Sequence, residues 1–343
     1  MPERLARPPK KILIIKPSSL GDVVHSLPFL NSIRSCFPKA EIHWVIAKGL
    51  EGLLDGHPMV DRLVVINKDL WKKISRATET AREVKRLFHS IRYEGYDLAI
   101  DLQGLLRSGL IAMASRAPVR VGFSEAREGS RLFYNRIVRG GRDIHAVERY
   151  MKVAGALGCD TEEIIFTFPF PKQENSGTDD FRERFRDYIV IVPGARWSTK
   201  IWPAENFGKT ASMLPLRSVV IGSRADAAIA ERVVGTSGGK AVSVAGKTSI
   251  TELIEIMRGA RLVISNDSGP MHIAAACGVP VAAIFGPTSP EMTGPYGRSH
   301  VVIRSSVSCS PCFKKKCSDL KCMKEITPAV VYERVRELLE DEG

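Results

Sequence analysis

The feature that most constrains the fold of this chain is the regular alternation of short apolar runs with segments of helical period. The first run, KILIIKP at residues 11–17, is a continuous apolar segment typical of a buried strand. Similar runs follow at residues 41–47, 61–67, 96–101, 119–124, 188–192, 218–221, 241–244, 262–265 and 281–285. Strands that alternate with helices predict right-handed βαβ units, and therefore parallel sheets in an α/β fold.

The alternation breaks once, near residues 160–187, and this break divides the chain. The segment FTFPFP is not a regular helix, and a polar stretch with Gly and Ser follows it. A length of 343 residues is also typical of two domains. We expect an N-terminal domain at residues 1–170, a linker at 171–187, a C-terminal domain at 188–326 and a final helix at 327–343.

The net charge of +12 is concentrated in one stretch of the chain. Between Arg107 and Lys152 there are ten basic and four acidic residues. Such an excess indicates either a solvated basic face or an anionic partner. Aromatic residues are sparse there, which disfavours a single-strand nucleic-acid binder and favours anionic groups on a ligand or lipid. No apolar run approaches the ~18 residues of a membrane span, and no signal-peptide segment follows the basic start, so we expect a cytoplasmic protein.

A loop of small residues, Ser18 to Asp22, follows the first predicted strand and opens a helix. In an open parallel sheet, ligands bind at the carboxyl ends of the strands, where Ser19 and Gly21 would keep the backbone accessible to an anion. Asp22 has two interpretations, because it could cap the helix or act as a carboxylate base. The loop does not contain the dinucleotide fingerprint G-x-G-x-x-G.

A second loop, SNDSGPMH at residues 265–272, lies between a predicted strand and an apolar helix. Its backbone N–H groups at Ser268 and Gly269 could hold a phosphate, and His272 lies about one turn further along. The structural alternative makes Asp267 the helix cap and packs His272 under the loop. The position of the loop after a central strand favours the functional interpretation.

A third loop, PGARWSTKIWP at residues 193–203, supplies the hydroxyls of Ser198 and Thr199 and the charge of Lys200 for phosphate oxygens. The alternative is an ordinary loop with a solvated lysine. The turn Gly286-Pro287-Thr288 ends the next strand, and we expect it to join the same rim. Three loops of the second domain are therefore expected to converge on one phosphate site.

Four of the seven cysteines form the pattern C-x2-C-x4-C-x4-C, which we call the cysteine quartet: Cys309, Cys312, Cys317 and Cys322. Disulfides are not expected in a reducing compartment, so the quartet is a candidate for a structural zinc or, as an alternative, an iron–sulfur centre. Such a metal would lack an open coordination position. We expect the quartet to lie outside the phosphate-binding loops and to play no part in catalysis.

These strings together resemble a known family. The segments are KILIIKPSSLGDVVHSLP, DLQGLLRS, AREGSRLFYNR, HAVER, SNDSGPMHIAAA and FGPTSP. They are similar to the ADP-heptose:lipopolysaccharide heptosyltransferases of glycosyltransferase family 9, over nearly the whole chain. The resemblance implies a GT-B fold with two Rossmann-like domains facing a central cleft. It also implies an inverting transfer of heptose from ADP-heptose to Kdo-lipid A, without a catalytic metal, at the cytoplasmic face of the inner membrane.

The resemblance also implies roles for individual residues. It makes Asp22 the base that deprotonates the acceptor hydroxyl and Lys200 the group that neutralises the diphosphate. Donor-binding roles are implied for Ser198, Thr199, Lys200, Asp226, Asp267, Ser268, Gly269 and His272. Acceptor-binding roles are implied for Ser19, Gly21, Arg107, Arg127 and Arg149.

The sequence segments do not agree on which acceptor the enzyme uses. The N-terminal strings look most like heptosyltransferase I, which adds the first heptose to Kdo, whereas the C-terminal strings look more like heptosyltransferase II. We favour type I, because in GT-B enzymes the acceptor is bound mainly by the first domain. The alternatives are type II, a GT-B transferase with another nucleotide sugar, and a non-catalytic basic module that binds nucleotides or nucleic acid. The expected partners are ADP-heptose, Kdo-lipid A and an anionic membrane surface, but not nucleic acid.

Overall fold

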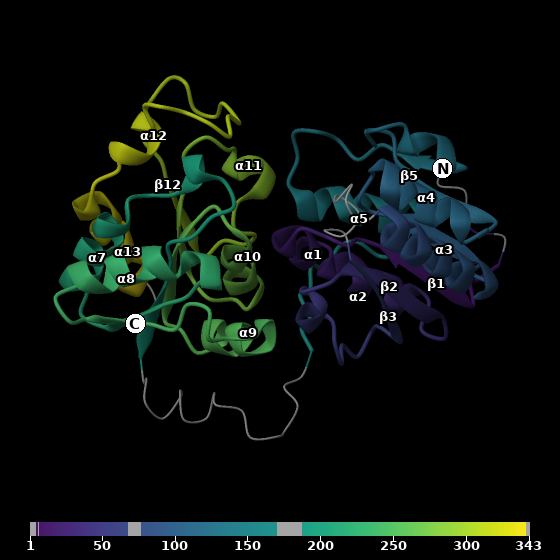
Figure 1. The fold of residues 1–343 in the computed structure, drawn as a ribbon, viewed down its shortest axis with the longest axis horizontal. Coiled ribbons are helices and arrows are strands. Elements are labelled where there is room, and N and C mark those ends of the chain that lie inside the picture. The colour runs from purple at the N-terminus through teal and green to yellow at the C-terminus, as the bar shows by residue number, and fades with distance from the viewer. Residues whose placement is uncertain (1–4, 6, 68–76, 170–186, 341–343) are drawn as a thin grey trace. The chain divides into compact units, whose positions relative to one another are not determined.

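The computed structural model describes residue 5 and residues 7–67, 77–169 and 187–340. The chain divides into two compact units, residues 1–170 and 171–343, each built on one six-stranded sheet (Figure 1). The linker expected at 171–187 lies outside the described residues except for its last residue. No helix in the described part of the chain is long and apolar enough to cross a membrane.

The first unit has the strand order β3-β2-β1-β4-β5-β6, with every neighbouring pair parallel. Its strands are β1 (Lys11–Ile15), β2 (Glu41–Ala47), β3 (Arg62–Ile66), β4 (Leu98–Asp101), β5 (Val119–Phe123) and β6 (Arg136–Val138). Its helices are α1 (Leu20–His25), α2 (Leu27–Cys36), α3 (Ala77–Tyr93), α4 (Leu106–Ala114) and α5 (Ala146–Ala156), with 3-10 turns η1 (Glu51–Leu53) and η4 (Ser130–Phe133). The apolar runs predicted the first five strands.

The second unit has the order β12-β11-β10-β7-β8-β9, again fully parallel. Its strands are β7 (Tyr188–Val192), β8 (Arg217–Val220), β9 (Ala241–Ser243), β10 (Leu262–Asn266), β11 (Val281–Ile284) and β12 (His300–Ile303). Its helices are α7 (Ala204–Met213), α8 (Ala227–Thr236), α9 (Ile250–Arg258), α10 (Gly269–Ala276), α11 (Pro290–Thr293), α12 (Lys321–Lys324) and α13 (Pro328–Glu340), with 3-10 turns η5 (Ser198–Lys200) and η6 (Arg224–Asp226).

Both sheets have the same topology when their strands are counted from the first of each unit. The order is 3-2-1-4-5-6, which is that of a Rossmann fold, so the expected α/β class is confirmed. The strand order reverses between β1 and β4 in one unit and between β7 and β10 in the other. Ligands bind such sheets at the carboxyl ends of the strands beside this reversal.

The apolar runs did not predict β6 and β12, the last strand of each unit. Both lie at an edge of a sheet, and their side chains are only partly buried. Ile137 of β6, for example, is 42% exposed. A strand that is covered on few sides needs no continuous apolar run, so the sequence carries no clear signal for it.

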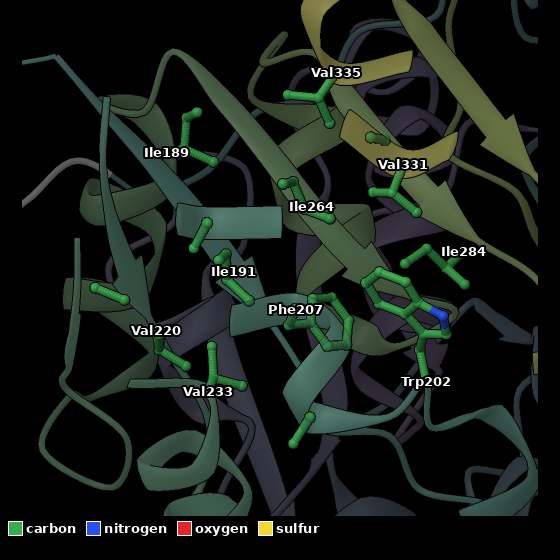
Figure 2. Close-up of a cluster of buried hydrophobic side chains, with 14 of the residues drawn as sticks. Ile189, Ile191, Trp202, Phe207, Val220, Val233, Ile264, Ile284, Val331 and Val335 are labelled. Carbon is green, nitrogen blue, oxygen red and sulfur yellow. The ribbon is translucent and has the colours of Figure 1, made fainter. Parts of the chain in front are cut away.

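The core of the second unit fixes the loop that follows β7. The Trp202 side chain is fully buried, and its ring packs edge-on against Phe207 of α7 with the ring centres 4.8 Å apart. Figure 2 shows both rings beside Ile264 and Ile284 of the central strands. The Trp202 indole N–H also donates to the Ile326 carbonyl at 2.9 Å. A large aromatic anchor of this kind holds the preceding residues of the loop in place.

Candidate functional site

The first unit carries a carboxylate at the carboxyl end of β1. Asp22 is the third residue of the short helix α1, and its Oδ2 accepts hydrogen bonds from the Ser19 N–H at 2.8 Å and the Ser19 hydroxyl at 2.6 Å. Ser19 is therefore the N-cap, and the interpretation of Asp22 as the capping residue itself is wrong. Asp22 contributes to the capping box through one oxygen. Its side chain remains 39% exposed, which leaves the carboxylate accessible from solvent.

Lys16 places a positive charge beside the other oxygen of Asp22. Its Nζ lies 3.6 Å from Asp22 Oδ1 and 3.5 Å from the Leu102 carbonyl, and its side chain is only 3% exposed. Burial works to lower the pKa of Lys16, but Asp22 and Tyr150 outweigh this effect, so its pKa is raised above 10.5. Lys16 is therefore charged at neutral pH and stabilises the ionised form of Asp22.

Helix α5 brings two more residues to this carboxylate. The buried Tyr150 hydroxyl donates to Asp22 Oδ1 at 3.4 Å, and burial raises the pKa of this phenol. The guanidinium of Arg149 stacks on the Phe123 ring at 4.6 Å, and its charge acts on both Lys16 and Tyr150. The buried Nε of Arg149 lacks a hydrogen-bond partner within the described residues. The structure thus places this predicted acceptor residue close to Asp22.

The other two predicted acceptor arginines are exposed at the same edge of the sheet. Arg107 lies in the first turn of α4, and Arg127 lies in the loop after β5. The Arg127 N–H donates to the Gly104 carbonyl at 2.8 Å, which fixes the backbone of this loop against the end of β4. Glu125, the nearby acid, accepts hydrogen bonds from the N–H groups of Gly140 and Gly141; these outweigh burial and lower its pKa to about 2.

Sequence reasoning missed Lys16 and Tyr150. The signal for Lys16 was present, because a lysine that ends an otherwise apolar central strand at its ligand-binding end is an unusual residue to bury. Tyr150 had no such signal. It lies 128 residues from Asp22 in the chain, and only the packing of α5 against α1 and α2 brings the two together.

The second unit brings the three predicted phosphate loops together through Asp267. Lys200 Nζ lies 2.6 Å from Asp267 Oδ2, and the Thr288 hydroxyl donates to the same oxygen at 2.5 Å. The Asp267 side chain is 5% exposed, and that of Lys200 is 17% exposed. The convergence of these loops is therefore confirmed. Asp267 holds the lysine, and the N-cap of α10 is Ser268, so the cap interpretation of Asp267 is wrong.

Asn266 links two of these loops through its side chain. Its Oδ1 accepts a hydrogen bond from the Trp202 N–H at 3.1 Å, and its Nδ2 donates to the Pro193 carbonyl at 2.7 Å. Because Trp202 is anchored in the core, these bonds set the position of the intervening residues, Lys200 among them. His272 is buried in the first turns of α10, and Gly269 begins that helix. The backbone N–H groups at this helix start remain suited to an anion.

The remaining predicted donor residues have distinct surroundings. The Thr199 hydroxyl is buried and donates to the Lys314 carbonyl at 2.9 Å, whereas Ser198 is exposed. Asp226 accepts hydrogen bonds from the Ser223 N–H at 2.8 Å and the Ser223 hydroxyl at 2.6 Å. A Cβ at Gly194 would lie 2.5 Å from Asp226 Oδ1, so a side chain at this position would displace the carboxylate from the loop after β7.

The segment that carries the cysteine quartet lies outside the phosphate loops in sequence but packs against them. The N–H groups of Cys312 and Phe313 donate to the Pro287 carbonyl at 3.0 and 2.7 Å. Lys315 lies over the Trp197 ring at 5.2 Å, and Lys200 lies over the same ring at 4.8 Å. The hydrogen bond from Thr199 to this segment adds a third contact. The quartet segment therefore forms part of the support for the Lys200 loop.

The thiols of the quartet differ in their environment. Cys322 is buried, and its pKa is raised by burial and by the other three cysteines. Cys317 is exposed, and N–H groups of Leu320 and Asp319 lower the pKa of its thiol. Within the described ranges, no three His, Cys, Asp or Glu side chains form a group that could hold a metal ion. The structural zinc therefore stays a prediction.

Comparison with known proteins shows which family the chain belongs to. The model of glycosyltransferase family 9 (heptosyltransferase) matches residues 84–323. Lipopolysaccharide heptosyltransferase 1 of Pseudomonas aeruginosa is 33% identical over 317 residues, which cover 90% of this chain and 87% of that protein.

Two solved structures have the same fold along nearly their whole length. A family 9 glycosyl transferase of Veillonella parvula has a TM-score of 0.82 and 26% identity, and the match covers 97% of each chain. The E. coli heptosyltransferase WaaC with ADP has a TM-score of 0.78 and 25% identity, with 96% of this chain and 99% of that chain covered. The chain therefore belongs to glycosyltransferase family 9, the heptosyltransferases, and is a glycosyltransferase of the GT-B class.

Proposed function

We propose that this chain transfers L-glycero-D-manno-heptose from ADP-heptose to the Kdo-lipid A inner core of lipopolysaccharide, with inversion at the anomeric carbon. The observation that carries the proposal is the half-exposed Asp22 carboxylate beside the buried charge of Lys16. An alcohol is a weak nucleophile, so a base has to accept its proton as the new bond forms. Asp22 can do this, because one of its oxygens caps α1 while the other faces Lys16 and Tyr150.

The reaction that we propose is a single displacement. The acceptor oxygen forms a bond to the anomeric carbon while the bond from that carbon to the ADP phosphate oxygen breaks. The proton of the acceptor hydroxyl passes to Asp22, and ADP leaves with the electron pair of the broken bond. We expect Lys200 to stabilise the negative charge that develops on the diphosphate, and we expect no metal cofactor for this step.

The donor is proposed to bind the second unit at the convergent loops. Lys200, the start of α10 and the Ser198 hydroxyl offer positive charge and hydrogen-bond donors to a diphosphate. In the described state Asp267 holds Lys200, and Thr288 shares the same carboxylate oxygen. Asp267 would therefore orient the lysine toward the phosphates, and Asp226 beside Gly194 is a candidate partner for the ribose.

The acceptor is proposed to bind the first unit through its arginines. Kdo and lipid A carry carboxylate and phosphate groups, and the buried unpartnered Nε of Arg149 is a donor suited to such a group. Arg107 and Arg127 add charge at the same edge. We favour the first heptose transfer over the second, in line with the 33% identity to a protein named heptosyltransferase 1. We also propose that the protein acts at the cytoplasmic face of the inner membrane.

The experiment that tests this function is product analysis after mixing the protein, ADP-heptose and Kdo-lipid A. A heptosylated product with inverted configuration is expected. Turnover only with an acceptor that already carries one heptose would assign the protein to type II. Greater thermal protection by UDP than by ADP would indicate another nucleotide sugar, and binding to random DNA without turnover would support the non-catalytic alternative.

The role of Asp22 is tested by Asp22→Asn. The amide keeps an oxygen that can accept the Ser19 hydrogen bonds, but it removes the base. We expect kcat to fall ~10²–10⁴-fold while ADP-heptose affinity stays within a few-fold. Glu252→Gln is a matched control, because Glu252 Oε2 accepts the Ser249 N–H at 2.7 Å in the capping box of α9. Near-normal turnover, or unfolding of the Asp22 variant alone, would mean that Asp22 is structural.

A further inference from the structure

Helix α4 exposes two of its large apolar side chains to solvent. Leu106 is 41% exposed and Met113 is 46% exposed, and both lie with Leu110 on one stripe of the helix. The opposite side of α4 buries Ser108 and the neighbouring small residues, together with Ile111. A surface helix normally turns its larger apolar residues toward the core. The outward stripe of α4 is therefore an apolar surface that the fold of the first unit does not use.

Helix α3 lies beside α4 (Figure 1). It brings cations next to the Met113 end of this stripe. Lys85, Phe88 and Arg92 of α3 and Met113 and Arg116 at the end of α4 line a hollow of about 500 Å³, together with three further residues. No carboxylate is among its lining residues. Tyr93, at the end of α3, is 72% exposed. We call this surface, formed by the outer sides of α3 and α4, the α3–α4 face.

The chemistry of the α3–α4 face matches one kind of partner. Within the described part of the chain, Lys85, Arg92 and Arg116 form no ion pair, so their charges are available to an external anion. Cations that flank an apolar stripe with an aromatic ring at its end are typical of helices that lie in the interface of an anionic membrane. The apolar side chains enter the headgroup region, and the cations contact lipid phosphates.

One end of this face, the start of α4, lies near Asp22. Helix α4 begins at the carboxyl end of β4, and β4 is the neighbour of β1 in the sheet. The Ser18 N–H donates to Gln103 Oε1 at 3.4 Å, so the loops after these two strands are in contact. The apolar stripe of α4 therefore starts at the sheet edge that carries Asp22 and runs to the opposite edge, where the hollow between α3 and α4 lies. A lipid surface at α4 would bring a membrane-anchored acceptor to that edge.

We propose that the α3–α4 face is the surface by which the first unit docks on a bilayer that contains anionic phospholipids. The inference rests on the proposed function for the identity of the acceptor, but the binding of lipid does not depend on it. Docking along α4 would place the start of this helix, which lies at the edge that carries Asp22, at the headgroup level, where the sugars of a lipid-linked acceptor lie.

The test is sedimentation of the full chain with phosphatidylcholine vesicles, with or without phosphatidylglycerol. We expect binding only to the anionic vesicles. The double variant Lys85→Glu with Met113→Ser should bind about 30-fold more weakly, since each unit of charge near an anionic surface changes binding about fivefold. The control is Lys209→Glu with Met213→Ser on α7, where the lysine is exposed and the methionine is 40% exposed. The control should bind as the native protein does.

Two outcomes would overturn the inference. One is the absence of binding to anionic vesicles by the native chain, and the other is an equal loss of binding in both double variants. If the α3–α4 variant fails to fold, binding of the native chain to anionic vesicles is measured at increasing salt concentration. Electrostatic docking predicts that this binding weakens as the salt concentration rises.

Transfer activity is measured separately, which keeps the two proposals distinct. With an acceptor dispersed in detergent, the α3–α4 variant should retain native turnover, whereas turnover with acceptor in vesicles should fall. Vesicle binding by a chain without heptose transfer would refute the proposed function and leave the docking surface standing. Stronger binding to random DNA than to anionic vesicles would refute the docking surface.

Discussion

Replacing Lys16 with methionine should separate the electrostatic role of this residue from its packing role. Methionine fills a similar volume but carries no charge. The buried ammonium lies 3.6 Å from Asp22 Oδ1, so its removal should make the carboxylate easier to protonate. If Asp22 is the base, the acidic limb of the pH–rate profile should move to higher pH.

The size of this shift follows from the geometry. Two unit charges 3.6 Å apart interact by roughly 4–5 kcal/mol at an effective dielectric constant of 20. Asp22 is 39% exposed, so solvent screening reduces this to about 1–3 kcal/mol. The acidic limb should therefore shift by about one to two pH units. On the acidic limb, below the pKa of the base, turnover should fall roughly 10- to 100-fold relative to the native enzyme, and turnover above pH 8 should change only a few-fold.

The assay is ADP release with saturating acceptor between pH 4.5 and 9, together with thermal unfolding. Because the pKa of Lys16 is raised in the folded state, its contribution to stability is present below 10.5 and is lost only as the pH rises through the folded value. The contribution of Lys16 to the free energy of unfolding should therefore be constant between pH 4.5 and 9. Lys11→Met is the matched control, because Lys11 begins the same strand and pairs with Glu94 at 3.0 Å, at the opposite edge of the sheet.

A Lys16→Met variant with the native pH profile would refute the reasoning, because the charge would then have no effect on the catalytic base. An equal loss of turnover at every pH, with a lower melting temperature, would also refute it and assign Lys16 a packing role. A shift in the Lys11→Met profile as large as that of Lys16→Met would show that the effect is not local to Asp22.

Three further predictions concern the other proposed roles. Lys200→Ala should weaken ADP-heptose binding and lower kcat, since charge on the leaving diphosphate grows in the transition state; unchanged kcat/KM would remove Lys200 from the site. Arg127→Ala and Arg149→Ala should each raise the acceptor KM roughly 10- to 150-fold, the range for one charge-assisted hydrogen bond, with little change in the donor KM; equal effects on both substrates would make these arginines structural. Replacing the cysteine quartet with serines should raise the donor KM more than it lowers kcat, because its segment supports Thr199; loss of all turnover in a folded protein that has lost a bound metal would contradict this.

Much of the fold was predictable from the sequence because buried strands and helices have recognisable patterns of apolar residues. The strands at the centre of each sheet are covered on both faces, so they read as continuous apolar runs, and the runs at 41–47 and 188–192 coincide with β2 and β7. The loop before Asp22 and the loop around Asp267 were also visible, since each follows such a run at its carboxyl end. The edge strand β6 has no continuous apolar run, because its side chains are only partly buried.

The sequence by itself determined ten of the twelve strands that the structure describes and which loops carry polar residues at their carboxyl ends. Only the tertiary structure decided which of these residues meet. Tyr150 and Lys16 reach the same oxygen of Asp22, and Thr288 reaches the carboxylate that holds Lys200. Apart from the contact between Lys16 and Asp22, these contacts join residues on elements that are distant in the chain. The packing of helices on a sheet sets the distances between these residues. The local pattern of apolar residues in the sequence does not specify that packing.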